Sequence, residues 1–191
     1  PHDANEPPYP GRDTTLELLR GLFKRNIPAL VHARRADEIS NTLKVFREEY
    51  GLDVIILGGE DGFRVIDELR QYGAGVAVGP EIMQYEKGKP IHNVDLLADA
   101  GLRVAFGSGA TSGTKYLPMN AAYAVRHGMD EDKAFRAMTI YPAELLRVDD
   151  RIGSIDVGKD ADLVILSGDP LEFDSRVEKV IVNGEVVYEQ Q

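Results

Sequence analysis

Short apolar runs alternate with amphipathic segments along most of the chain. Four runs are apolar at nearly every position, and they span residues 26–31, 54–57, 75–78 and 102–106. Strands that are apolar on both faces are typical of a parallel sheet covered by helices. The segments between them carry apolar residues at helical spacing, for example Ile39, Leu43, Phe46 and Tyr50. The pattern therefore predicts an α/β fold, either doubly wound or a (β/α)8 barrel.

The flanking segments add further expectations. Asp13 or Thr14 is expected to cap a first helix, and its apolar stripe would be Leu16, Leu19, Leu22 and Phe23. Residues 1–12 are rich in proline and predict an extended segment, whereas residues 83–91 predict a polar loop. Helices are also expected over 117–127, after the capping residue Asp130, and around Pro142.

The pattern changes to strands after Ile152. Residues 161–166, 177–182 and 185–188 each form an apolar run, and Asn183-Gly184 separates the last two. Asn-Gly between two apolar runs is the strongest short signal for a β-hairpin. We therefore expect two parts, a strand–helix part over residues 1–150 and a β segment over residues 151–191.

Composition narrows the possible partners. The net charge of −10 would repel a phosphate backbone, which argues against nucleic acid and against anionic membrane surfaces. The chain has no cysteine and no run of about 20 apolar residues, so disulfides, thiolate sites and a membrane span are not expected. These features agree with a cytoplasmic protein. The first ten residues contain neither an initiator Met nor a signal-peptide pattern, and they suggest a piece of a longer protein.

Chemistry in parallel α/β folds lies beyond the carboxyl ends of the strands. His32 follows the first run, and the acidic residues Glu60 and Asp61 follow the second. This acidic pair either binds a hard cation or marks a helix N-terminus, where the helix dipole favours negative charge. Residues 107–115 lie between a strand and a helix, where a phosphate-binding loop would be found, but they do not have the required Gly-Lys-Ser/Thr order. The remaining way to bind an anion here would be a nest of backbone N–H groups. The Gly-x-Ser-x-Gly motif of serine hydrolases is also absent around Ser108.

Several segments resemble one family. Residues 153–165, which contain Gly-Lys-Asp-Ala-Asp-Leu, and residues 180–188 resemble the C-terminal signature of the amidohydrolase superfamily. Residues 139–143 are similar to its Thr-x-Asn-Pro-Ala helix start, with Tyr141 in place of Asn. Residues 31–39 resemble the imidazolonepropionase-related branch, and the resemblance runs over nearly the whole chain.

The resemblance implies a (β/α)8 barrel plus a small β-sandwich built from both chain termini. This sequence matches barrel strands five to eight and the C-terminal share of the sandwich. The first four strands, with the family's His-x-His pair and its bridging Lys or Glu, have no counterpart here. Because half a barrel leaves a strand edge and an apolar interior uncovered, we expect a partner, either an N-terminal half chain or a second copy of this one.

The resemblance also implies a chemistry, in which a divalent metal, usually zinc, activates water to attack a C–N bond of a small-molecule substrate. His32 matches the first metal-ligand position of this half. The second position falls on Gly58, and the third, which is the general-base aspartate in the family, falls on Gly109. A catalytic zinc needs three protein ligands, so the metal site of this chain is expected to be incomplete. Arg34 and Arg35 either bind a substrate carboxylate or are solvated.

Two functional hypotheses remain open on these grounds. In the first, the chain is part of a metal-dependent hydrolase acting on non-peptide or dipeptide C–N bonds. In the second, it is a non-catalytic scaffold or binding subunit descended from such an enzyme. Metal content and the presence of a complementary half would discriminate between them.

Overall fold

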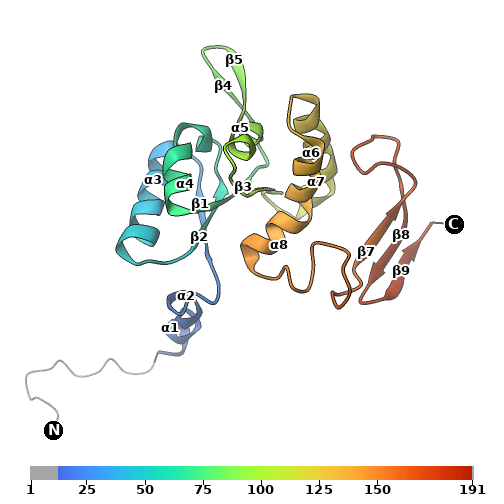
Figure 1. Ribbon diagram of the computed structural model, residues 1–191, viewed down its shortest axis with the longest axis horizontal. Coiled ribbons are helices and arrows are strands. Elements are labelled where there is room, and N and C mark those ends of the chain that lie inside the picture. The colour runs from blue at the N-terminus through green and yellow to red at the C-terminus, as the bar shows by residue number, and fades with distance from the viewer. Residues whose placement is uncertain (1–12, 191) are drawn as a thin grey trace, which may run out of the picture.

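A parallel four-stranded sheet forms the centre of the first part of the chain. The computed structural model describes residues 13–190. The sheet has the order β1-β2-β3-β6 and every neighbouring pair is parallel. Its strands are β1 (Ala29–Ala33), β2 (Val54–Gly58), β3 (Gly75–Val78) and β6 (Val104–Phe106). This arrangement confirms the predicted parallel α/β architecture (Figure 1).

Helices follow the strands in alternation. The longer ones are α3 (Ala36–Leu43), α4 (Ile66–Tyr72), α5 (Asn93–Asp99), α6 (Leu117–Arg126), α7 (Glu131–Met138) and α8 (Ile140–Leu146). A π-helical turn, η1 (Lys44–Glu49), extends α3, and two 3-10 turns are η2 (Gly62–Arg64) and η3 (Thr111–Tyr116). None of the helices in the described part of the chain is both long and apolar enough to cross a membrane.

The core lies on one face of the sheet. Because side chains alternate between the two faces of a strand, every second strand residue points toward the same side. Ile56, Val76, Val78 and Val104 are almost fully buried there. They belong to one apolar cluster with helix residues, among which Ile39, Leu43, Leu69 and Leu97 are completely buried.

The other face of the sheet is only partly covered. The register places His32, Leu57, Ala77 and Ala105 in one row across the four strands. At the edge of this face, the Leu30 side chain is 52% exposed and His32 is exposed as well. In a closed barrel this face would be the interior, so we refer to it as the open face.

A separate antiparallel sheet ends the chain. It has the order β7-β8-β9, with β7 (Leu163–Leu166), β8 (Val177–Val182) and β9 (Glu185–Glu189). Asn183 and Gly184 both have positive φ, 50° and 82°, as the predicted hairpin turn requires. The expected boundary near residue 150 falls between α8 and β7.

Two local predictions are wrong. Residues 83–91 are not a polar loop, because β4 (Met83–Glu86) and β5 (Lys89–His92) pair as an antiparallel hairpin that projects beyond the sheet (Figure 1). The first helix is broken at Leu19 into α1 (Thr14–Leu18) and α2 (Arg20–Phe23). Its expected stripe does not enter the core, since Leu16 and Phe23 are each 62% exposed. The extended segment expected over 1–12 lies outside the described residues.

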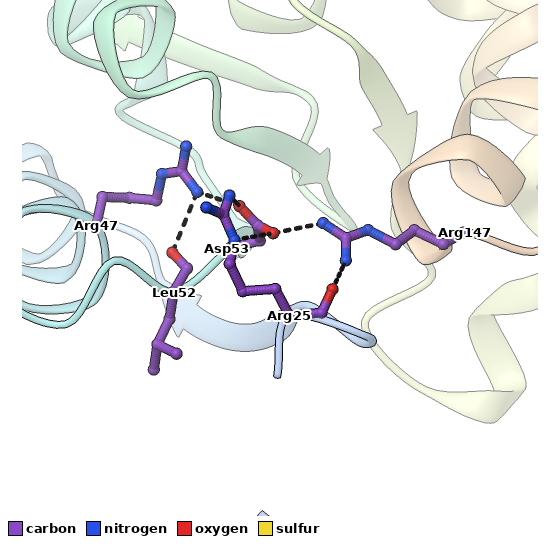
Figure 2. A network of polar contacts seen from close by, with 5 residues as sticks. All are labelled: Arg25, Arg47, Leu52, Asp53 and Arg147. Atoms are coloured by element: carbon purple, nitrogen blue, oxygen red, sulfur yellow. Dashed lines mark hydrogen bonds and ion pairs between the residues drawn. The ribbon is translucent and has the colours of Figure 1, made fainter. Parts of the chain in front are cut away.

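A charged cluster joins α8 to the amino-terminal end of the sheet. The Asp53 carboxylate, directly before β2, accepts hydrogen bonds from the guanidinium groups of Arg25, Arg47 and Arg147 (Figure 2). Arg147 also donates to the backbone carbonyl of Arg25, and Arg47 donates to that of Leu52. One carboxylate therefore connects four segments of the chain. These are the segment before β1, the turn η1, the residue before β2 and the residue after α8.

Candidate active site at the carboxyl ends of the strands

Backbone hydrogen bonds align the carboxyl ends of the four strands. Gly59 N–H donates to the carbonyl of Ala33 at 2.9 Å, and Gly107 N–H donates to that of Val78 at 2.7 Å. Asp61 N–H donates to the carbonyl of Arg34 at 2.9 Å. The loops that leave β1, β2, β3 and β6 thus lie side by side, as expected for the end of a parallel sheet where chemistry is located.

His32 lies inside β1, one residue before its end. Its side chain projects from the open face and is exposed, in register with Leu57 of β2. This placement agrees with a residue that would face the interior of a complete barrel. Metal ligation by His32 stays a prediction, because it belongs to no cluster of possible metal ligands within the described part of the chain.

Gly58, at the second predicted ligand position, has a backbone conformation and neighbours that disfavour a side chain. Its φ is +96°, which residues with a side chain rarely adopt. A Cβ atom there would lie 2.9 Å from Oε2 of Glu60 and 3.2 Å from Cγ of Arg34. A histidine at this position would therefore have to displace both neighbouring side chains and strain the backbone.

Gly109, at the position of the expected general base, is similarly constrained. Its φ is +67°, and a Cβ atom would lie 2.5 Å from Cδ of Pro80. An aspartate would clash with the proline ring that follows β3. The residues present at this end therefore do not fit a catalytic divalent metal. Over residues 13–190, no group of three or more His, Asp or Glu side chains is arranged to hold a metal ion.

Arg34 and two glutamates form the main polar cluster at this end. Nε of Arg34 donates to Oε1 of Glu60 at 2.7 Å, and Nη2 donates to Oε2 of Glu81 at 3.0 Å. Glu60 is only 6% exposed, and its second oxygen, Oε2, has no hydrogen-bond partner. The hydrogen bond to Glu60, followed by the charges of Glu60 and Glu81, raises the pKa of Arg34 above its ordinary value.

The other predicted site residues, Arg35, Asp61 and residues 107–115, lie outside the Arg34 cluster. Arg35 is exposed and pairs with the neighbouring Asp37 at 3.1 Å, so it does not join the Arg34 cluster. Asp61 lies 3.7 Å from Arg64, in agreement with an acidic residue at the start of a helical turn. The possible anion nest over residues 107–115 is folded as a glycine turn and η3, and it stays a prediction.

Asn93 has a structural role near this end of the sheet. It is fully buried at the start of α5, where Nδ2 donates to the carbonyl of Gly59 at 2.8 Å. Its Oδ1 accepts from the backbone N–H of Phe63 at 2.9 Å. Asn93 therefore positions the loop that carries Glu60. No local signal identifies this role, because its partners lie about thirty residues earlier.

Two histidines, His92 and His127, lie together beside α6. The rings of His92 and His127 stack with centroids 4.4 Å apart, and Tyr123 packs on His127 at 4.3 Å. These contacts attach the β4–β5 hairpin to α6. Nearby, burial and the charge of Asp99 raise the pKa of the Asp95 carboxyl above its usual range.

Comparison with known proteins places the chain in a family. A sequence model of the amidohydrolase family matches residues 5–188. The chain belongs to the amidohydrolase family. It is 36% identical over 102 residues to imidazolonepropionase of Porphyromonas gingivalis, which covers 48% of this chain and 24% of that protein. It is 39% identical over 67 residues to adenine deaminase of Rubrobacter xylanophilus, which covers 35% of this chain and 11% of that protein.

Solved structures of the family show the same architecture. An amidohydrolase from Thermotoga maritima superposes with a TM-score of 0.84 and 30% identity, over 95% of this chain and 49% of that one. An adenosine deaminase from Xanthomonas campestris with bound zinc has a TM-score of 0.62 at 22% identity, covering 94% and 49%, and is similar in fold alone. The chain thus spans about half of each solved relative. The predicted half of a (β/α)8 barrel is confirmed, as is the likeness to imidazolonepropionases.

Proposed function

We propose that this chain forms one half of an amidohydrolase-type barrel that hydrolyses C–N bonds of small molecules, non-peptide amides or dipeptides, and that a complementary half completes the site. The observation that carries the proposal is the overlap of 95% of this chain with only 49% of the Thermotoga amidohydrolase. The carboxyl ends of β1–β3 and β6 would then form part of the active-site rim. The metal ligands that this chain lacks would come from the complementary half.

The two outer strands of the sheet support the need for such a half. Among the described residues, β1 pairs only with β2, and β6 pairs only with β3. The N–H of Ala29 and the carbonyl of Ala33 form hydrogen bonds on the side of β1 that faces β2. Because backbone groups alternate in direction along a strand, those of Leu30 and His32 point to the free edge. Free N–H and C=O groups at a sheet edge are a template for pairing with further strands.

We favour a complementary half-barrel over a second copy of this chain. A second copy would contribute another His32, but also another Gly58 and another Gly109, and so would not complete a metal site. A half-barrel with four parallel strands would pair with both free edges and cover the open face around Leu30. It would also be the source of any zinc site, to which His32 would add one ligand.

The roles of the site residues follow from their positions. His32 projects into what would be the barrel interior, where a small substrate would bind. Arg34 is engaged by Glu60 and Glu81, whereas the exposed Arg35 has a single nearby carboxylate partner, Asp37. Arg35 is therefore the more available of the two for a substrate carboxylate.

A specific observation favours a second candidate, the non-catalytic scaffold or binding subunit. Gly58 and Gly109 both have positive φ, and a side chain would press on Glu60 and Arg34 at the first position and on the Pro80 ring at the second. A barrel completed by another half would then bind a small molecule without hydrolysing its C–N bond.

Co-expression tests the two candidates. The chain is produced together with the part of the Thermotoga amidohydrolase on which this chain does not superpose. The complex is then assayed against cyclic amides, ureas and dipeptides. A 1:1 complex with turnover that His32→Ala abolishes supports the hydrolase. A 1:1 complex without turnover supports the binding subunit, and failure to associate overturns both. Tyr85→Ala, at an exposed position in β4 of the hairpin, is the control and should leave association and turnover unchanged.

A further inference from the structure

We propose that the guanidinium of Arg34, held between Glu60 and Glu81, is the permanent cation of this end of the sheet and excludes a divalent metal ion from these residues. The inference concerns the same site as the proposed function, but it requires no turnover and rests on the contacts of this chain alone.

The Arg34–Glu60 pair fills the place where a side chain at position 58 would lie. The distances of 2.9 Å and 3.2 Å from the ideal Cβ position of Gly58 end on the carboxylate of Glu60 and the side chain of Arg34. The glycine and the ion pair are therefore complementary, since a side chain at position 58 would require the Glu60 carboxylate and the Arg34 side chain to shift. The loss of the predicted ligand and the presence of the pair are two aspects of one arrangement.

Arg34 is held at this place from several sides. Its backbone N–H donates to Oε2 of Glu38 at 2.8 Å, and its carbonyl accepts from the backbone N–H of Asp61 at 2.9 Å. Its guanidinium contacts Glu60 and Glu81 from the loops after β2 and β3. The backbone contacts fix the position of the residue, and the guanidinium can leave the site only by breaking its contacts to both glutamates.

Arginines also neutralise the other carboxylate of the β2 loop. Asp61 pairs with Arg64, and Arg64 pairs in turn with Glu86 of the β4–β5 hairpin at 2.9 Å. A metal ion needs anionic or neutral donors that are free to coordinate, and repulsion by a nearby guanidinium weakens its binding. The Oε2 atom of Glu60 is buried without a hydrogen-bond partner, but it lies against Gly58 and belongs to a carboxylate already bound by Arg34.

Zinc titration calorimetry and thermal unfolding of the purified chain test this inference. The unsubstituted chain should show no zinc site with a dissociation constant below about 100 µM, and neither zinc nor EDTA should change its Tm. Arg34→Gln should lower the Tm by a few degrees, because it leaves the buried Glu60 carboxylate unpaired. In the double variant with Glu60→Gln, much of this loss should be recovered, whereas the control Arg35→Gln should have little effect.

Two results would overturn the inference. One is stoichiometric zinc that is lost in Glu60→Gln or His32→Ala. The other is strict additivity of the Arg34 and Glu60 substitutions, which would show that the two groups do not act as a pair. The same titration of the complex with the complementary half separates this inference from the proposed function. Zinc bound there should be unaffected by Glu60→Gln, whether or not the complex hydrolyses any substrate.

Discussion

Replacement of Asp53 by asparagine tests how the half-barrel is held together. The substitution keeps the shape of the side chain but removes the negative charge that three arginines share (Figure 2). It leaves three guanidinium groups close together, and the asparagine NH2 group cannot accept their hydrogen bonds. The contact between α8 and the amino-terminal end of the sheet should weaken as a result.

The size of the effect follows from the environment of the carboxylate. The Asp53 side chain is only 16% exposed, whereas the guanidinium groups of Arg25 and Arg147 are about half exposed, which screens part of the attraction. Hydrogen bonds to a charged group contribute about 1.5–3 kcal/mol. We therefore expect Asp53→Asn to lower the free energy of unfolding by about 2 kcal/mol at pH 7, equivalent to a Tm lower by about 4–8 °C.

The pH dependence gives an independent check. The hydrogen bond from Arg25, supported by those from Arg147 and Arg47, holds the pKa of the Asp53 carboxyl well below its usual range. A carboxylate with a lowered folded-state pKa stabilises the fold fully above its unfolded pKa of about 4 and loses this contribution as the pH falls further. The difference in the free energy of unfolding between the unsubstituted chain and Asp53→Asn should therefore stay constant from pH 7 to about pH 5 and shrink below about pH 4.

Urea unfolding followed by circular dichroism measures both quantities. Asp150→Asn, at an exposed position after α8, is the matched control and should change the free energy of unfolding by less than about 0.5 kcal/mol. Equal small effects of the two substitutions, or a difference between them that does not depend on pH, would refute the reasoning.

Three further predictions concern the core, the glycine turn and the open face. Leu97→Ala should cost about 2–5 kcal/mol in urea unfolding because Leu97 is completely buried, and a loss below 1 kcal/mol would contradict the assigned core. Gly109→Ala should destabilise the chain by at least 1 kcal/mol more than Gly51→Ala, since both glycines have φ near +65° but only Gly109 meets Pro80. Comparable losses would show that the space at Gly109 is not limiting. Leu30→Lys should leave the Tm of the isolated chain within about 2 °C yet abolish co-purification with the complementary half, because Leu30 lies at the half-exposed edge of the open face. Retained association would exclude that face as the contact surface.

Much of the architecture can be predicted from local patterns. Strand β3 and strand β8 have the predicted bounds, because β3 is apolar and is followed by Gly79, and β8 ends at the Asn183-Gly184 turn. Asp130 caps α7 as expected, with its carboxylate accepting from the backbone N–H of Lys133 at 3.0 Å. The hairpin over β4 and β5 was missed because its strands are mostly polar, although Lys87-Gly88, both at positive φ, was an available turn signal.

The sequence by itself determined the family, the parallel half-barrel and the absence of side chains at Gly58 and Gly109, since these depend on residue type and local spacing. Only the tertiary structure decided which neighbours a side chain at either glycine would meet, and that Arg34 lies between Glu60 and Glu81. It also decided that Asn93 positions the loop after β2 and that Asp53 joins four segments. The physical reason is separation along the chain: Arg34 and Glu60 are 26 residues apart and Asp53 and Arg147 are 94 residues apart, and only the packing of strands and helices brings them together.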